Sequence, residues 1–179
     1  MADTRKKIVC IEDDRETAAL VAEELLDRGY DVTVAHDGRE GLAAILRLMP
    51  DLVLSDISMP AMSGFELLER LTALAPRFSY MPFVFLTALT DRDNELKGRQ
   101  LGADDYVTKP IDFDLLDTII AARLKAVARA GLLPKTILLN DREVEVLTWV
   151  ARGKTSAEIA QILGLTKRTI DFHTDNARN

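Results

Sequence analysis

The sequence predicts an α/β fold with a parallel sheet, followed by a second, small all-α domain. From residue 8 to about residue 129, short apolar runs alternate with segments of helical periodicity, which is the pattern of strands joined by crossover helices. After residue 139 the strand-like runs give way to three helix-length segments. Splitting the formal charge after residue 134 gives 16 − 23 = −7 for the first part and 7 − 6 = +1 for residues 135–179, so the two parts also differ electrostatically.

Five apolar runs are the strand candidates of the first part. They occupy residues 8–11, 32–34, 52–55, 83–87 and 106–108. Apolar residues recur between them at three- and four-residue spacings, which predicts helices that cover the sheet with one face. The repeating positions are Leu42, Ile45, Leu46 and Met49 in one segment, and Leu67, Leu71 and Leu74 in the next.

The segment 112–130 predicts the closing helix of this part, because its apolar residues lie on one side. Gly131 and Pro134 then give a helix stop followed by a breaker. The predicted organisation is therefore a first domain over residues 1–130, a linker over 131–139 and a second domain over 140–179.

The sequence of the second domain predicts two helices, then a tight turn, then a third helix. Two helices begin with a capping box, Asn140 with Glu143 and Thr155 with Glu158, and Thr166 can cap a third. Gly164 suits a left-handed turn between two closely packed helices. The expected small core consists of Val144, Val146, Leu147, Val150, Ile159, Leu163, Leu165 and Ile170, with Trp149 packed beside it.

Composition excludes several classes of protein. With 47% hydrophobic and 29% charged residues the chain is globular and not disordered, and its net charge of −6 excludes a uniformly basic nucleic-acid binder. The single cysteine, Cys10, excludes a disulfide framework and a cysteine-based zinc site, so we expect it in the core. No apolar run is long enough for a signal peptide or a membrane span, so we expect a cytoplasmic protein without a membrane partner.

Acidic residues follow two of the predicted strands. Glu12, Asp13 and Asp14 come after the first strand and Asp56 after the third, so their side chains meet at the carboxyl edge of the sheet. Two unit charges about 5 Å apart repel by roughly 3 kcal/mol at an effective dielectric constant of 20, so the cluster should recruit a cation or a proton. Hard oxygen ligands without His or Cys favour Mg²⁺.

Two more polar residues are expected at the same edge. Thr87 closes the fourth strand and Lys109 follows the fifth, directly before Pro110. A carboxylate nucleophile, a divalent cation, a hydroxyl and an ammonium group are the parts needed to transfer a phosphoryl group to an aspartate. Each residue alone is ordinary, and their conjunction at four strand ends supports the interpretation.

Four motifs resemble the receiver domain of bacterial two-component response regulators. They are IEDD at 11–14, SDISMP at 55–60, FLTAL at 85–89 and GADDYVTKP at 102–110. The resemblance implies a doubly wound five-stranded parallel sheet of the flavodoxin-like order 2-1-3-4-5. It also implies that Asp56 accepts a phosphoryl group from a histidine kinase, with Asp14 only a neighbour. The remaining implied roles are Mg²⁺ binding by Glu12, Asp13, Asp56 and the backbone carbonyl of Ser58, phosphoryl contacts by Thr87 and Lys109, and a switch formed by Thr87 and Tyr106.

Residues 140–179 resemble a LuxR-type (NarL/FixJ-type) helix-turn-helix domain. By that resemblance a recognition helix carries the DNA-binding residues Lys167, Arg168, Thr169 and His173. The family pattern continues into a last helix beyond Asn179, which we expect this chain to lack. Asp171 and Asp175 also depart from the neutral or basic residues usual there, and the net charge of +1 is a small electrostatic footprint.

The leading hypothesis is a two-component regulator that dimerises when phosphorylated and places two recognition helices about 34 Å apart on DNA. The alternative is a receiver that signals by protein contacts or acts as a phosphate sink, with a helix-turn-helix remnant that does not bind DNA. We expect no enzyme beyond Mg²⁺-dependent self-phosphorylation and autodephosphorylation, because an aspartyl-phosphate hydrolase needs an acid where Ser58 stands. An FMN-binding relative is disfavoured, since acids and not a phosphate-cradling loop follow the first strand.

Overall fold

The computed structural model describes residues 5–74, 77–88, 92–130 and 139–178. Its first part is a five-stranded parallel sheet of order β2-β1-β3-β4-β5, which confirms the order implied by the resemblance. The strands are β1 (Lys7–Ile11), β2 (Asp31–Ala35), β3 (Leu52–Asp56), β4 (Phe83–Thr87) and β5 (Asp105–Thr108). Each predicted strand lies within one residue of the observed bounds.

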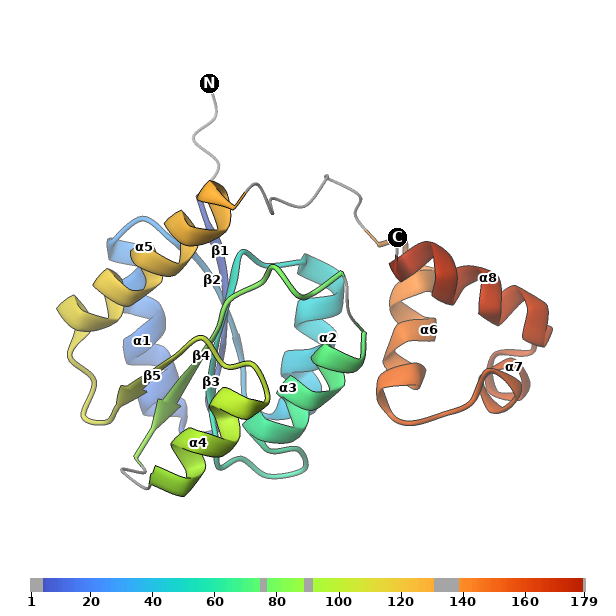
Figure 1. Cartoon of the computed structure of the whole chain (residues 1–179), viewed down its shortest axis with the longest axis horizontal. Coiled ribbons are helices and arrows are strands. Elements are labelled where there is room, and N and C mark those ends of the chain that lie inside the picture. The colour runs from blue at the N-terminus through green and yellow to red at the C-terminus, as the bar shows by residue number, and fades with distance from the viewer. Residues whose placement is uncertain (1–4, 75–76, 89–91, 131–138, 179) are drawn as a thin grey trace.

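Helices cover both faces of the sheet, as Figure 1 shows. They are α1 (Arg15–Asp27), α2 (Gly38–Leu48), α3 (Gly64–Ala73), α4 (Arg92–Gln100) and α5 (Phe113–Arg129). Residues alternate between the faces because side chains of a strand have a period of two. The face towards α2 and α3 buries Val9, Ile11, Val53, Phe83 and Phe85, and the face towards α1 and α5 buries Ile8, Cys10, Leu52, Leu54, Val84 and Leu86.

Most of the predicted helix positions are buried. Six of the seven repeating residues of α2 and α3 lie in the core, and the exception, Met49, is the left-handed cap residue that ends α2. Cys10 is fully buried, and this burial raises the pKa of its thiol to about 12, as expected of a core residue without a redox role. The predicted linker residues 131–138, including Gly131 and Pro134, lie outside the described residues.

The second part consists of α6 (Asp141–Ala151), α7 (Ser156–Leu163) and α8 (Lys167–Arg178), and we call residues 139–178 the effector. Both predicted capping boxes are present, and Gly164 adopts the left-handed conformation at φ 65°. The helices pack around Val146, Ile159, Ala160 and Ile170, with Trp149 against them.

Leu147 and Val144 differ from their prediction. Both were expected in the small effector core, but Leu147 lies with Ala151 and Ala177 in the apolar cluster that also contains α2 and α3, and Val144 packs against that cluster. The reason is that α6 presents one face to α7 and α8 and a second face to the first part of the chain, where it packs beside α2 (Figure 1).

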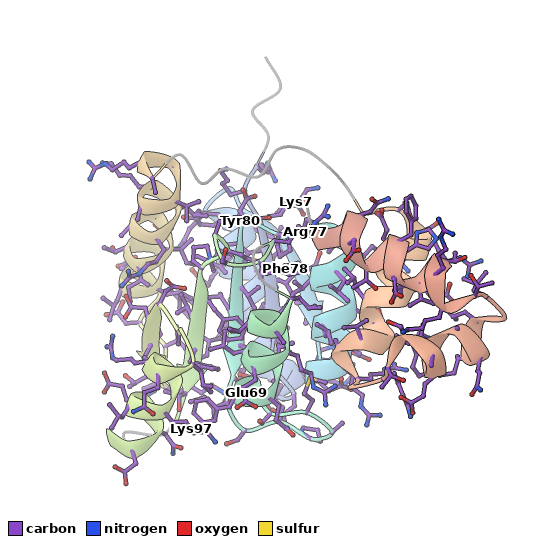
Figure 2. The ribbon with its side chains drawn as sticks, turned by 45° about the vertical axis from the view of Figure 1, so that its right-hand side comes forward. Lys7, Glu69, Arg77, Phe78, Tyr80 and Lys97 are labelled. Atoms are coloured by element: carbon purple, nitrogen blue, oxygen red, sulfur yellow. The ribbon has the colours of Figure 1, made fainter. Side chains whose placement is uncertain are left out.

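Two arginines of the first part bind the ends of effector helices. The Arg70 guanidinium donates a hydrogen bond to the carbonyl oxygen of Ala151, at the end of α6. The Arg77 guanidinium donates to the carbonyl oxygen of Ala177, at the end of α8, and Arg77 lies on the side that faces the effector in Figure 2. Cations stabilise the carbonyl end of a helix, so both contacts favour docking of the effector. Within the described residues, no helix is sufficiently long and apolar to cross a bilayer.

Candidate functional site

The carboxyl edge of the sheet brings the predicted site residues to one place. Glu12 follows β1, Asp56 ends β3, Thr87 ends β4 and Lys109 follows β5. Parallel strands end at the same edge, which is why residues far apart in the sequence meet there. Glu12, Asp56 and Thr87 are buried, whereas Asp13 is exposed at the rim.

Three carboxylates form a compact acidic group. One oxygen each from Glu12, Asp13 and Asp56 lies within 4.8 Å of the others. Burial raises the pKa of Glu12, and the nearby charge of Asp56 raises it further, while the hydrogen bond from Lys109 lowers it. Oxygen donors of this kind, without a sulfur or imidazole ligand beside them, suit a hard divalent cation such as Mg²⁺.

Lys109 bridges two of these carboxylates. Its Nζ lies 2.6 Å from Oε2 of Glu12 and 3.1 Å from Oδ2 of Asp56. Burial lowers the pKa of Lys109, but the hydrogen bonds to both carboxylates outweigh that effect and the pKa lies above its usual value. Lys109 therefore stays protonated and compensates part of the negative charge.

The two oxygens of Asp56 have different partners. Oδ2 accepts the hydrogen bond from Lys109, and Oδ1 accepts from the backbone amides of Ile57 at 2.6 Å and Ser58 at 3.3 Å. Ser58 thus contacts Asp56 through its amide, and the predicted use of its carbonyl stays a prediction. These bonds fix the carboxylate in one orientation at the edge of the sheet.

Gly64 is a site residue that the sequence reasoning missed. A Cβ atom at this position would lie 2.3 Å from the backbone oxygen of Asp56 and 2.8 Å from the ring of Phe85. Only glycine lets the start of α3 approach Asp56 this closely. The available signal was a glycine directly after Ser63, which caps α3.

Thr87 lies on β4 and Tyr106 on the neighbouring strand β5, two residue pairs apart along the strands. Thr87 pairs with Thr108, and Tyr106 pairs with Phe85, whose ring centre lies 5.5 Å from that of Tyr106. The Tyr106 hydroxyl donates a hydrogen bond to the carbonyl of Glu95 in α4 at 3.1 Å. Their predicted joint role as a switch stays a prediction.

Gly98 makes this position of Tyr106 possible. A Cβ atom at residue 98 would lie 1.7 Å from the tyrosine hydroxyl oxygen, so the hydroxyl occupies the space of the missing side chain. The sequence reasoning missed this residue, because an isolated glycine in a polar helix has no specific signature.

The predicted DNA-binding residues lie on α8 in different environments. Lys167 and Arg168 are exposed, and Thr169 shares a hydroxyl hydrogen bond with the cap residue Thr166 at 2.9 Å. His173 is half-buried, and its Nδ1 is buried with no hydrogen-bond partner among the described residues. Phe172, which was not predicted as a DNA contact, is exposed.

Comparison with known families identifies both parts of the chain. Residues 8–121 match the family described as "Response regulator receiver domain". Residues 138–179 match the family "Bacterial regulatory proteins, luxR family".

Curated relatives align with nearly the whole chain or with about two thirds of it. "Probable transcriptional regulator ycf29" from Pyropia yezoensis is 31% identical over 190 residues, which cover 97% of this chain and 85% of the relative. "DNA-binding response regulator MtrA" from Mycolicibacterium smegmatis is 38% identical over 125 residues, which are 70% of this chain and 53% of the relative. The aligned region thus spans about half of that second relative.

Solved structures resemble the first part. A receiver domain (CheY-like) from Methanospirillum hungatei JF-1 aligns with a TM-score of 0.67 at 31% identity, covering 72% of this chain and all of the other. The receiver domain of the Francisella response regulator 1452 aligns with a TM-score of 0.64 at 31% identity, covering 68% and 98%.

Proposed function

Because the chain belongs to the response regulator family and joins a receiver domain to a luxR-type helix-turn-helix, we propose that it accepts a phosphoryl group on Asp56 and thereby switches a DNA-binding output. The observation that carries the proposal is the convergence of Glu12, Asp13, Asp56 and Lys109 at one edge of the sheet. The proposed domains are 1–130 and 140–179, joined by 131–139. Response regulators are generally not catalytic enzymes. We therefore propose no activity beyond Mg²⁺-dependent self-phosphorylation and autodephosphorylation of Asp56.

The chain's own residues are arranged for phosphoryl transfer. The Asp56 carboxylate attacks the phosphorus of a phosphohistidine in the partner kinase, a P–O bond forms as the P–N bond breaks, and the histidine recovers a proton. Glu12, Asp13, Asp56 and the Ser58 carbonyl would hold Mg²⁺, which when bound neutralises phosphoryl oxygens. Lys109 is close enough to exchange its contact with Asp56 for one with the new phosphoryl group.

Thr87 and Tyr106 are the proposed switch residues. Phosphorylation adds charge and strong hydrogen-bond acceptors at Asp56, next to the strand that Thr87 ends. Tyr106 follows on the adjacent strand and bonds α4, so a shift of β4 is transmitted to that helix. A population change from 1:99 to 99:1 requires about 5.5 kcal/mol of differential stabilisation.

The output surface of the proposal is α8. Lys167, Arg168, Thr169 and His173 are its DNA-contacting residues, and a homodimer presents two such helices to successive major grooves. A sensor histidine kinase and DNA are the proposed partners, and a cytoplasmic location follows from them.

Labelling with acetyl phosphate in the presence of Mg²⁺ tests the proposal. Asp56→Asn should abolish incorporation, because an amide is no nucleophile here. Asp14→Asn is the matched control: this exposed acid caps α1, Asn caps equally well, and labelling should match the wild type. Full labelling of the Asp56→Asn protein would refute the assignment.

A receiver that signals by protein contacts is the second candidate. Two observations favour it: Asp171 and Asp175 lie on α8, and the effector docks on α2 and α3 through Arg70 and Arg77. A gel shift across a salt series separates the candidates. Absence of binding at every salt concentration, with phosphorylation intact, supports this second candidate.

A further inference from the structure

A cavity lies at the amino edge of the sheet, at the opposite end of the strands from Asp56. Its volume is about 210 Å³, and its walls come from α3, from the first residue of β4 and from the segments that precede β4 and β5. Six large apolar side chains line it: Leu68, Leu71, Phe78, Met81, Phe83 and Leu101. The cavity is therefore separate from the acidic group at the carboxyl edge.

Asp104 is the charged residue of this cavity, since the other described residues that line it carry no charge. Its Oδ2 accepts a hydrogen bond from the backbone amide of Phe83 at 2.8 Å, and its own amide donates to the Phe83 carbonyl at 2.9 Å. Its Oδ1 makes no hydrogen bond within the described residues. The backbone thus holds the carboxylate in place and leaves one oxygen available.

The charge of Asp104 has no cationic partner in the described part of the chain. Burial raises the pKa of Asp104, and the charge of Arg123 lowers it by a smaller amount. The Arg123 guanidinium does not bond Asp104, because it donates to Oδ2 of Asp105 at 2.8 Å. A partly buried carboxylate without a partner keeps its desolvation cost, which a cation beside Oδ1 offsets.

The size of the cavity limits the size of a ligand. An apolar cavity of about 150 Å³ holds one benzene molecule, so 210 Å³ holds in proportion about eight non-hydrogen atoms. An apolar wall with one fixed polar group is the usual composition of a small-molecule site. The charge of Asp104 selects a cation, and the six apolar side chains select an apolar body behind it.

We propose that this cavity binds a small organic cation, whose ammonium group pairs with Oδ1 of Asp104 and whose aromatic or branched aliphatic body packs against the apolar wall. The site needs neither phosphorylation of Asp56 nor binding of DNA, so it is independent of the proposed function. Phe78 directly follows Arg77, which binds the carbonyl end of α8, so the bound cation lies beside the segment that contacts the effector.

Three probes of similar size and different charge test the proposal on the full chain. They are benzylamine, which is cationic at neutral pH, benzyl alcohol, which is neutral, and benzoate, which is an anion. Benzylamine should bind about tenfold more tightly than benzyl alcohol, a factor typical of a hydrogen bond to a charged group, and benzoate should not bind. In NMR titrations of isotope-labelled protein, the amides of Phe83, Leu101 and Gly102 should shift.

A charge variant connects this preference to Asp104. Asp104→Asn keeps an oxygen for the Phe83 amide and removes the charge, so benzylamine should bind about tenfold more weakly while benzyl alcohol binds as before. Glu69→Gln is the matched control, because Glu69 is an exposed acid of α3 that does not line the cavity. Its benzylamine affinity should equal that of the wild type.

A filling variant connects the binding to the cavity. Thr72 is an exposed residue of α3 that lines it, and its hydroxyl donates to the carbonyl of Leu68 at 2.9 Å. Thr72→Phe should prevent binding of both benzylamine and benzyl alcohol. Thr118→Phe is the control, because Thr118 is exposed on α5 and makes the same type of bond, to the carbonyl of Asp114 at 2.8 Å. Circular dichroism checks that the variants are folded.

Several results overturn the proposal. Equal affinities for benzylamine and benzyl alcohol remove the cation, and so does an unchanged benzylamine affinity of Asp104→Asn. Shifts confined to the amides of Glu12 and Asp56 assign the cation to the carboxyl edge instead. Absence of binding by all three probes removes the site, whereas labelling of Asp56 by acetyl phosphate is unaffected and keeps its own test.

Discussion

At the scale of single residues, the charges at the carboxyl edge are held in balance by Lys109. Glu12 has no exposed surface, and its described cationic contact is the Lys109 ammonium at 2.6 Å. A buried carboxylate that loses its cation keeps the full desolvation cost. The same lysine is therefore important for stability as well as for the proposed chemistry.

Lys109→Ala should lower the free energy of unfolding by about 2 kcal/mol in the absence of Mg²⁺, since hydrogen bonds to charged groups contribute roughly that amount. The pKa of Glu12, already raised by burial, should rise further. A carboxyl group whose pKa is raised in the folded protein stabilises the fold at pH values below its ordinary pKa, and this contribution is lost as pH rises through the raised pKa. The deficit should therefore grow between pH 4.5 and neutral pH in urea unfolding with EDTA.

Lys6→Ala is the control for this prediction. Lys6 pairs with Asp51 at 2.9 Å on the surface, where an ion pair contributes about 0–1 kcal/mol. Equal losses in both variants, or a Lys109→Ala deficit independent of pH, would contradict the role of the buried pair.

Tyr30 provides a second test, at alkaline pH. Its hydroxyl donates to Oδ1 of Asp117 at 2.7 Å, and burial followed by this bond raises its pKa to about 12. The contribution of the hydroxyl is thus present below pH 10 and lost as pH rises through 12. The free energy of unfolding of the wild type should exceed that of Tyr30→Phe by about 1 kcal/mol at pH 8. Denaturant titrations should show this difference shrinking above pH 10.

Tyr80→Phe is the matched control for Tyr30. The Tyr80 hydroxyl is buried without a hydrogen-bond partner among the described residues, so its removal should cost nothing or stabilise the protein. A loss as large as that of Tyr30→Phe would show that the Asp117 bond is not what stabilises Tyr30.

The residues of the site were predictable where position in the sequence determines position in space. Glu12, Asp56, Thr87 and Lys109 end or follow apolar runs, and parallel strands bring such ends together. Gly64 was not predictable, because its importance depends on how closely a helix approaches a strand.

At the scale of elements, α4 contains a local conflict between helix propensity and packing. Gly98 is buried under Tyr106, whose hydroxyl bonds the same helix at Glu95. Glycine costs a helix about 1 kcal/mol relative to alanine. A Cβ atom at residue 98 would lie 1.7 Å from the Tyr106 hydroxyl oxygen, so only glycine leaves room for the tyrosine here.

Gly98→Ala should therefore fail to stabilise the protein, because the gain in propensity is offset by the displaced ring and the lost Glu95 bond. In a Tyr106→Ala background the new methyl group meets only the ring of Phe85, at 3.1 Å, and this ring can shift into the space left by Tyr106, so the same change should stabilise by up to about 1 kcal/mol. Thermal unfolding of the four proteins in this cycle measures the difference. A gain of equal size in both backgrounds would disprove the conflict.

The bounds of the strands were predictable to within one residue, because buried parallel strands are short apolar runs between polar ends. The order of the strands could not be predicted in this way, since periodicity does not specify which strand lies beside which. That order came from the resemblance of four motifs to a family.

At the scale of the whole molecule, the effector lies against the receiver through α6 and the end of α8. Leu147, Ala151 and Ala177 are buried there, and Arg70 and Arg77 bind carbonyl ends. Nothing in the sequence distinguished these residues from the core of an independent helical domain. The docking arises from complementarity between two surfaces, which a periodic pattern does not encode.

Trp149, the only tryptophan of the chain, reports on this docking. It lines a groove between α2 and α6 together with Ala43 and Arg47. The double variant Arg70→Ala/Arg77→Ala should release the effector, shift Trp149 emission to longer wavelength and increase its quenching by acrylamide. Arg129→Ala, on the exposed end of α5, should leave emission unchanged. Unaltered emission in the double variant would show that the arginines do not hold the interface.

Helix α3 touches the two ends of this arrangement. Its first residue, Gly64, lies against Asp56, and its last turn carries Arg70, which binds the effector. Gly64 and Arg70 are six residues apart, which corresponds to about 9 Å along the helix at 1.5 Å per residue. The proposed phosphoacceptor and the docked effector thus contact different turns of the same short helix, so in the proposed function a rearrangement at Asp56 has a direct mechanical connection, through α3, to the contact that Arg70 makes.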